Sequence, residues 1–132
     1  MKLEKKYVSF QDDRGSIVDV IESINFNGAT VITSKAGSVR GNHFHKKTVQ
    51  YAFVLEGKML AKSKKVGMDL EEVTLEPGDL ISHDFYEAHV FEALVDSKFL
   101  VLSSGLRTGK DYELDTFRLS SLIEDFSETD IK

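Results

Sequence analysis

Short segments rich in β-branched and aromatic residues recur along almost the whole chain, and turn signals separate them. The intervening sequences NFNG, EGK, EPGD and VDSK supply the glycine, proline, asparagine and aspartate residues that turns favour. Strands at this spacing predict one all-β sandwich or barrel over residues 1–132. The segments are 17–21, 30–34, 38–45, 48–55, 58–64, 71–75, 79–83, 88–94 and 98–104. One short helix is expected around residues 120–126, where Ser120 or Ser121 is available as an N-cap.

The composition narrows the classes of function. The chain has 132 residues with 41% hydrophobic side chains, which suffices for one core, and a net charge of −5, which disfavours nucleic acid as a partner. It has no cysteine, so thiol catalysis and thiolate metal ligands are excluded. No apolar run approaches the length of a membrane span, and the charged N-terminus has no secretory signal pattern. We therefore expect a cytoplasmic protein with a small-molecule or protein partner.

The segment GNHFHKKTVQ carries the most specific chemistry. Side chains alternate along a strand, so His43 and His45 should share one face while Phe44 points to the other. In a barrel, that face is the interior. The same alternation places Gln50 with Ala52 and Val54 on one face of the next strand, where Gln50 can meet the two imidazoles. Tyr51 has the opposite parity and is expected to pack outside.

A second segment, EPGDLISHDFYEAHVF, supplies further histidines. His89 opens a strand and is expected to converge with the first pair. For His83 two interpretations stay open: it is a fourth imidazole that faces the interior, or it is a core histidine with its hydrogen bonds satisfied. Tyr86 and Tyr112 are expected to be surface turn residues, although either could stack on a base or sugar.

The spacing of these residues resembles the two motifs of the cupins, whose fold is a double-stranded β-helix, or jelly-roll, barrel. The first motif is matched by Gly37, His43, His45, Gln50 and Gly57, and the second by Gly78, Asp79 and His89. Metal-binding cupins usually have a glutamate where Gln50 stands. A neutral amide removes charge and a good ligand, so we expect a weak metal site or none. If a metal is bound, the resemblance implies His43, His45, Gln50 and His89 as its ligands, with His83 as another candidate.

A narrower resemblance joins DRGSIVDVIES (13–23), VRGNHFHKKTVQ (39–50) and DTFRL (115–119) to the sugar-nucleotide cupins. These include the dTDP-6-deoxy-hexulose 3,4-ketoisomerases and, more distantly, the dTDP-4-dehydrorhamnose 3,5-epimerases. The resemblance implies a 3,4-ketoisomerase that acts on a nucleotide-linked 6-deoxy-4-keto sugar, with a dTDP-sugar as the favoured substrate. Such an enzyme works without a metal or other cofactor and serves polysaccharide or glycoside biosynthesis. Apolar residues on both faces of YAFVL and FLVL further favour a homodimer.

The resemblance also implies roles for individual residues. His43 is the expected base, and His45 the expected acid or the group that polarises the carbonyl, because imidazole titrates near neutrality. Gln50 is expected to hold an imidazole tautomer or a sugar hydroxyl, and His89 is expected to bind the substrate. Arg40 and Arg14 are candidates for the diphosphate; a bulge at Gly41 would turn Arg40 to the face of His43. Three alternatives stay open: a 3- or 3,5-epimerase, a metal-dependent cupin enzyme, and a sugar-binding cupin without catalysis.

Overall fold

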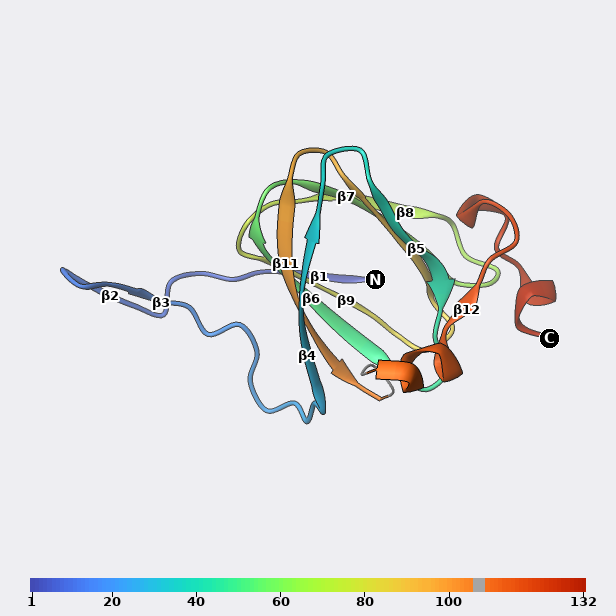
Figure 1. The fold of residues 1–132 in the computed structure, drawn as a ribbon, viewed down its shortest axis with the longest axis horizontal. Helices are drawn as coiled ribbons and strands as arrows, with labels where there is room; N and C mark the ends of the chain where they lie inside the picture. The colour runs from blue at the N-terminus through green and yellow to red at the C-terminus, as the bar shows by residue number, and fades with distance from the viewer. Residues whose placement is uncertain (106–108) are drawn as a thin grey trace.

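The computed structural model describes residues 1–105 and 109–132 and has the predicted barrel, made of two facing five-stranded antiparallel sheets (Figure 1). The first sheet has the order β1-β9-β6-β11-β4. Its strands are β1 (Lys2–Lys5), β9 (Asp79–His83), β6 (Val49–Glu56), β11 (Ser97–Ser104) and β4 (Gly28–Ser34). The second sheet has the order β12-β5-β10-β7-β8. Its strands are β12 (Phe117–Arg118), β5 (Val39–Phe44), β10 (Ala88–Ala93), β7 (Met59–Lys64) and β8 (Glu71–Leu75).

The barrel interior is built from alternate residues of both sheets. Strand β7, for example, buries every second side chain, as period-2 alternation requires. One end of the interior is apolar and close-packed, which anchors the polar cavity at the other end. The buried residues of this core are Ala52, Val54, Met59, Ala61, Leu75, Ile81, Phe91, Phe99 and Val101.

The outer face of β5 is covered by the C-terminal segment. Phe44 points away from the two histidines beside it, as predicted, and is 1% exposed. It stacks on Phe117 at 5.3 Å between ring centroids and contacts Phe126 at 5.4 Å. The C-terminal end of β5, at His43 and Phe44, is therefore buried on both faces, with an imidazole on the inside and an aromatic cluster on the outside.

The predicted C-terminal helix is wrong in type and in its cap. The segment forms two short 3₁₀ helices, η2 (Ile123–Asp125) and η3 (Glu128–Ile131), and η2 begins after Leu122 without a side-chain cap. Residues three apart eclipse each other in a 3₁₀ turn. This geometry lets Ile123 and Phe126 enter the same apolar cluster over Phe44.

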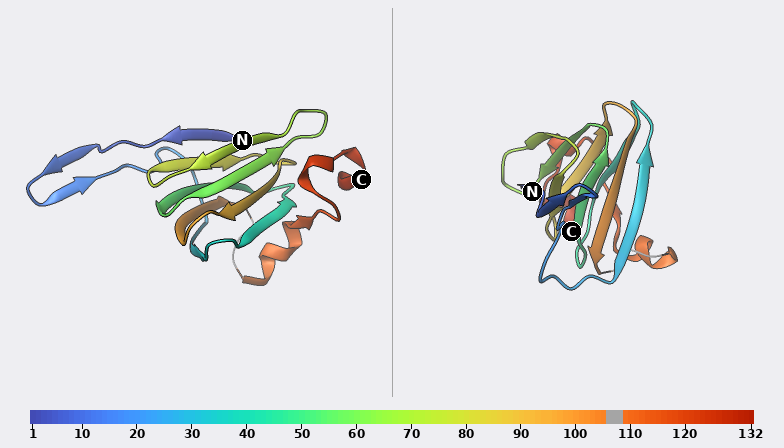
Figure 2. Two further views of the ribbon diagram at one scale, coloured as in Figure 1. Left: turned by 90° about the horizontal axis from the view of Figure 1, so that it is seen from above. Right: turned by 90° about the vertical axis from the view of Figure 1, so that its left-hand side faces the viewer.

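The N-terminal strands also differ from the prediction. The Lys-rich start of the chain forms β1, an edge strand, where charged side chains are tolerated. The strand expected over 17–21 ends at Ile17, because β3 (Gly15–Ile17) pairs only with β2 (Phe10–Asp12) in a separate hairpin. This hairpin projects beyond the barrel (Figure 2). We call residues 7–27, which contain it, the N-terminal arm.

No helix in the described part of the chain is long and apolar enough to cross a bilayer.

Candidate active site

A cavity of about 330 Å³ opens between the two sheets at the polar end of the barrel. Its apolar wall includes Ile32, Phe99 and Val101. Its polar lining consists of Arg40, His43, Gln50, His83, His89, Tyr112 and Arg118. A pocket of this size with few polar groups on an apolar wall suits one small organic ligand.

The four histidines of the chain form one cluster inside the barrel. The ring centroid of His43 lies 4.9 Å from that of His45 and 4.8 Å from that of His89. His83, whose orientation the sequence left open, lies inside the barrel and stacks on His89 at 4.4 Å. All four are buried, from 2% to 8% exposed, and His43 is the most accessible.

A local irregularity in β5 sets the direction of Arg40. His43 pairs with His89 and Gly41 pairs with Val90, so Asn42 is an extra residue in this strand. Gly41 and Asn42 both have positive φ, at 98° and 57°. A β-bulge of this kind reverses the parity of the residues before it. Arg40 therefore lines the same cavity as His43, as the bulge prediction required.

Glycine is required at the centre of this bulge. A Cβ atom at Gly41 would lie 2.7 Å from the carbonyl oxygen of His89. The close approach holds β5 against β10 at the point where both strands present their histidines. The same residue thus orients Arg40 and fixes the separation of His43 from His89.

Two backbone carbonyls fix the tautomers of the deeper histidines. His89 donates from Nδ1 to the Glu87 carbonyl at 3.0 Å, and His45 donates from Nδ1 to the Asp115 carbonyl at 2.7 Å. A carbonyl oxygen only accepts, so each Nδ1 carries the hydrogen. In the neutral rings Nε2 is then the acceptor.

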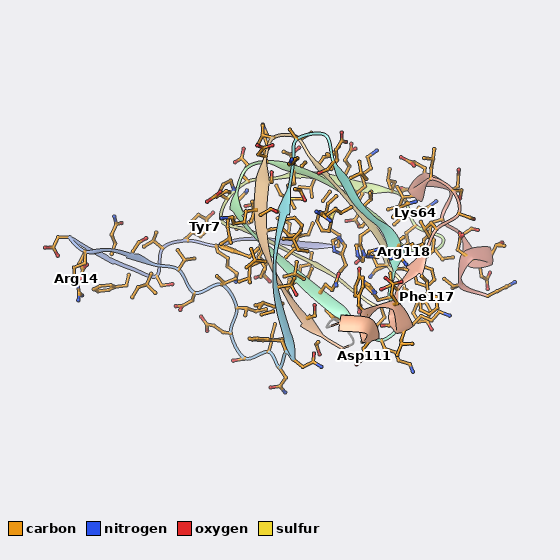
Figure 3. All side chains as sticks on the ribbon, viewed as in Figure 1. Tyr7, Arg14, Lys64, Asp111, Phe117 and Arg118 are labelled. Atoms are coloured by element: carbon orange, nitrogen blue, oxygen red, sulfur yellow. The ribbon has the colours of Figure 1, made fainter. Side chains whose placement is uncertain are left out.

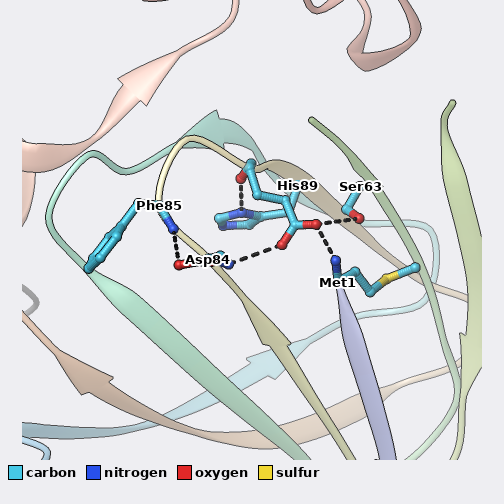
Figure 4. Close-up of polar contacts among 6 residues, drawn as sticks. Met1, Ser63, Asp84, Phe85 and His89 are labelled. Carbon is cyan, nitrogen blue, oxygen red and sulfur yellow. Dashed lines mark hydrogen bonds and ion pairs between the residues drawn. The ribbon is translucent and has the colours of Figure 1, made fainter. Parts of the chain in front are cut away.

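The loop that holds His89 is itself anchored (Figure 4). The buried carboxylate of Glu87 accepts hydrogen bonds from the Asp84 amide at 3.0 Å and from the Ser63 hydroxyl, and it is paired with the amino group of Met1. These contacts fix the Glu87 backbone, whose carbonyl orients His89.

Asp115 performs a similar task for His45. Its carboxylate accepts hydrogen bonds from the backbone amides of Lys46 and Lys47 and from the hydroxyl of Thr48. Burial raises the pKa of Asp115, but these hydrogen bonds outweigh burial and lower it below its usual value. An ionised Asp115 thus ties the end of η1 (Gly109–Asp115) to the turn that follows β5.

Burial makes the imidazoles of His83 and His89 poor proton acceptors. It lowers the pKa of His89 to about 3, with a further contribution from nearby His45 and an opposing one from the Glu87 carbonyl. Burial also lowers the pKa of His83 well below its usual value, and the adjacent His89 adds to this effect. Both rings are neutral at pH 7. The Nε2 atom of His89 has no hydrogen-bond partner among the described residues, so it can accept a hydrogen bond from a ligand hydroxyl.

Tyr112 belongs to the cavity, which corrects its assignment to the surface. Its hydroxyl oxygen lies 3.5 Å from Nε2 of His43. It is held there by η1, which the sequence did not predict, because that segment has no regular hydrophobic period. His45, in contrast, is not part of the cavity lining; it lies behind His43, with its centroid 5.9 Å from that of Tyr112.

The two arginines that the sequence suggested for binding a diphosphate, Arg40 and Arg14, are placed differently in the structure: Arg40 lines the cavity and Arg14 does not. Arg14 lies at the tip of the β2–β3 hairpin, is 82% exposed, and pairs with Asp12 (Figure 3). It does not line the cavity of its own chain. Arg118, which the sequence analysis did not single out, is in register with His43 on the neighbouring strand and lines the cavity. Its presence in DTFRL, the tail segment of the resemblance, was the available signal.

Known structures share this arrangement of strands. The dTDP-4-dehydrorhamnose 3,5-epimerase from Sulfolobus tokodaii is 21% identical, with 98% of this chain and 86% of that chain covered at a TM-score of 0.76. QdtA, a sugar 3,4-ketoisomerase from Thermoanaerobacterium thermosaccharolyticum in complex with TDP, is 21% identical over 90% and 88% of the two chains, at a TM-score of 0.74. ChmJ, a 3'-monoepimerase from Streptomyces bikiniensis in complex with dTDP-quinovose, is 15% identical over 89% and 68%, also at 0.74.

The fold is thus the jelly-roll barrel of the sugar-nucleotide cupins, as the sequence predicted. At these identities the likeness establishes the fold alone. No curated protein matches the sequence. A family model described as the polysaccharide biosynthesis C-terminal domain matches residues 10–94, and the chain belongs to this family.

Proposed function

We propose that the protein is an isomerase of a nucleotide-linked 6-deoxy-4-keto sugar and that it catalyses 3,4-ketoisomerisation by proton transfer. One observation carries the proposal: a single cavity is lined by a cluster of imidazoles and by two guanidinium groups, those of Arg40 and Arg118, from the neighbouring strands β5 and β12. The imidazoles suit the keto sugar, and the guanidinium groups suit a diphosphate. The structural likeness to QdtA, crystallised with TDP, supports the same substrate class.

The charge of the cavity supports an anionic ligand. Arg40 and Arg118 are the fully charged residues among the described ones that line it, although the protein as a whole has a net charge of −5. Arg40 donates from Nε to the Ser34 hydroxyl and from Nη2 to the Thr33 carbonyl, both at 2.9 Å. These acceptors are neutral, so they position the guanidinium without cancelling its charge. A positive cavity in a negative protein favours a ligand such as a nucleoside diphosphate.

His43 is the best-placed base. In the proposed reaction, Nε2 of His43 removes the proton from C3 of the sugar, and the electron pair passes to the C4 carbonyl to give an enediolate. The proton of the C3 hydroxyl is lost as that oxygen becomes the new carbonyl, the C4 oxygen takes up a proton, and His43 returns its proton to C4. His83 and His89 hold a proton too weakly for the base role at neutral pH.

The placement of Tyr112 favours it over His45 as the acid that serves the sugar oxygens. Its hydroxyl is at the cavity beside His43, whereas His45 lies behind that ring. His45 then acts by packing against His43 and keeping it oriented. Gln50 and His89 accept or donate hydrogen bonds to sugar hydroxyls from the cavity wall.

The test is turnover of dTDP-4-keto-6-deoxyglucose in deuterated water, followed by NMR. Ketoisomerisation predicts a 3-keto product that carries deuterium from the solvent at C4 and none at C5. Tight binding without exchange or product would instead indicate a sugar-binding protein without catalysis.

Tyr112 also supports a second candidate function, 3- or 3,5-epimerisation of the same substrate. An epimerase must return the proton to the opposite face of the sugar, which requires an acid distinct from the base. The pair of His43 and Tyr112 provides two such groups. In the same NMR experiment, a 3,5-epimerase would incorporate deuterium at C5 as well as C3 and would keep the carbonyl at C4.

A metal-dependent reaction has its own supporting observation. One nitrogen from each of His43, His45 and His89 lies within 4.8 Å of the others, and three neutral imidazoles suit a divalent transition metal. Gln50 and His83 line the same cavity and are the candidates for a fourth ligand, and such a metal would polarise a bound carbonyl. Mass spectrometry of untagged protein, before and after incubation with zinc, nickel or iron, tests this; about one metal per chain would favour it over metal-free proton transfer.

We also propose a homodimer in which the N-terminal arm contacts the partner. The arm exposes Tyr7 by 78%, Val8 by 50%, Phe10 by 54% and Ile17 by 57%, although it projects away from its own barrel. A second copy would cover these side chains. It would also allow Arg14, which cannot serve its own cavity, to approach the partner's diphosphate.

A subunit-mixing experiment tests the dimer and Arg14 together. Light scattering after gel filtration should give twice the chain mass. Arg14→Ala and His43→Asn variants should each be impaired at sub-saturating substrate, and their mixture should regain activity, because one hybrid site then contains both native residues. A monomer, or a mixture no more active than its parts, would contradict the shared site.

A further inference from the structure

The two arginines of the cavity have different hydrogen-bond partners. Arg40 is bonded to a hydroxyl and a carbonyl, so its charge is uncompensated by these contacts. Arg118 is bonded to a carboxylate: Nη1 donates to Oε2 of Glu113 at 2.7 Å, and Nη2 donates to Oε1 at 2.9 Å. The guanidinium also lowers the pKa of Glu113, which keeps the carboxylate ionised.

We propose that Glu113 competes with the diphosphate of the substrate for Arg118 and thereby sets the affinity of the site. In the free protein, Glu113 occupies both terminal nitrogens of Arg118. In the complex, the diphosphate takes these nitrogens and Glu113 is released to solvent. The inference rests on the proposed nucleotide-sugar function and adds to it a residue that lowers affinity.

The competition follows from geometry. A bidentate carboxylate and a bidentate phosphate require the same two parallel N–H groups of a guanidinium. Both cannot occupy Arg118 in this way at once. Arg118 lines the cavity in register with His43, so a diphosphate attached to a sugar at His43 is within the reach of this side chain.

The exchange is also energetically easy. Arg118 and Glu113 are 60% and 58% exposed. Exposed pairs of this kind contribute little to stability, because solvent and salt screen them. A phosphate with greater negative charge can therefore displace the carboxylate, while Glu113 still lowers the net affinity for the ligand.

The test is calorimetric titration of thymidine diphosphate into the protein of residues 1–132 at low salt. Glu113→Gln should lower Kd about 2- to 5-fold, which is the size expected for removal of an exposed pair. Arg118→Gln should raise Kd about 10-fold or more, since it removes charge-assisted hydrogen bonds to the ligand. Adding Glu113→Gln to Arg118→Gln should produce no further gain, because Glu113 then has nothing to occupy.

The double variant separates competition from simple repulsion. If Glu113 only repels the anion, Glu113→Gln will tighten binding equally with and without Arg118, and the proposal is wrong. Glu56→Gln is the matched control, because it removes the same charge from another exposed ion pair, with Lys98, outside the cavity. Its Kd should stay within about 1.5-fold of the native value, as long-range effects of exposed charges are screened.

A parallel titration with inorganic pyrophosphate distinguishes failure of this inference from failure of the function. Binding of thymidine diphosphate that is indifferent to Glu113→Gln overturns the competition and leaves the proposed function intact. Binding of pyrophosphate alone, with the predicted pattern in the variants, supports the competition and overturns the nucleotide-sugar assignment. Binding of neither anion overturns both.

Discussion

The barrel and the N-terminal arm contain similar apolar residues but bury them to different extents. Phe44 in β5 is 1% exposed, whereas Phe10 in the arm is 54% exposed. The barrel closes its sheets over its own core and covers the outside of β5 with the C-terminal segment. The arm makes a two-stranded hairpin, which is marginal in isolation. The barrel thus provides both the stability and the site of one chain, while the arm has the properties of a surface that another molecule covers.

The largest expected effect lies inside the barrel and concerns chemistry. His43→Asn should reduce kcat on the keto sugar by about 10³-fold, because it removes the base. The Kd for thymidine diphosphate should stay within about 2-fold, since the diphosphate is bound by the arginines. The measurements are steady-state kinetics and calorimetry, with circular dichroism to verify folding. Substantial exchange of the C3 proton in this variant would remove His43 from the base role.

Replacing a phenylalanine by alanine should have a large effect on stability in the barrel and a small one in the arm. Phe44→Ala should lower the free energy of unfolding by about 3–5 kcal/mol, because it leaves a cavity in a buried aromatic cluster. Phe10→Ala should change it by less than about 0.5 kcal/mol in the isolated chain and should weaken self-association instead. Urea titrations at several protein concentrations distinguish the two effects. Equal losses from both variants would mean that the arm packs on its own barrel.

A pair of glycines tests the close approach of β5 to β10. Gly41 and Gly15 both have positive φ, but only at Gly41 would a new Cβ meet backbone. Gly41→Ala should destabilise the protein by about 2–3 kcal/mol and weaken ligand binding, because strain and a clash add together. Gly15→Ala, in the arm, should cost only about 1–2 kcal/mol, because it adds strain without a clash, and should affect ligand binding less than Gly41→Ala does. Similar behaviour of the two would argue against the bulge as the element that sets the site.

The response of the free energy of unfolding to pH is the smallest of these effects when it is expressed per pH unit. His89 has a pKa of about 3 in the folded protein and His83 one well below its usual value, so the unfolded chain binds their protons first as the pH falls. Stability should therefore be retained above about pH 6.5 and decline below it, by up to about 1.4 kcal/mol per pH unit for each histidine. The contribution of His89 should level off near pH 3. Urea titrations between pH 7 and 4 measure the slope, and His89→Gln should reduce it.

Much of the barrel was predictable because its signals are local. Strand alternation correctly placed His43 and His45 inside and Phe44 outside, and the glycine at 41 correctly suggested the bulge that turns Arg40 inward. Edge strands such as β1 were missed, since solvent on one side permits a Lys-rich sequence there.

The rest of the site depends on contacts between distant segments. Tyr112 and Arg118 enter the cavity through the C-terminal segment, whose path depends on tertiary packing rather than on local pattern. Arg14 failed to reach the cavity for a related reason: its DRG sequence predicts a turn, but not where the turn projects. His43 and His45 could be found from the sequence because they lie two residues apart in one segment.

The hydrogen bonds of Asp115 have a consequence for the stage of synthesis at which the site can bind its ligand. Asp115 fixes the tautomer of His45 and the turn at residues 46–48, yet it lies about 70 positions later in the chain. On the ribosome, residues 1–104 emerge first and contain every strand of the barrel except β12. A nascent chain at that stage has most of its sheet structure but an unsecured His45 and no Tyr112 beside His43. Ligand binding should therefore appear only when residues 109–132 have emerged and docked, so that activity depends on this later segment as well as on the formation of the barrel.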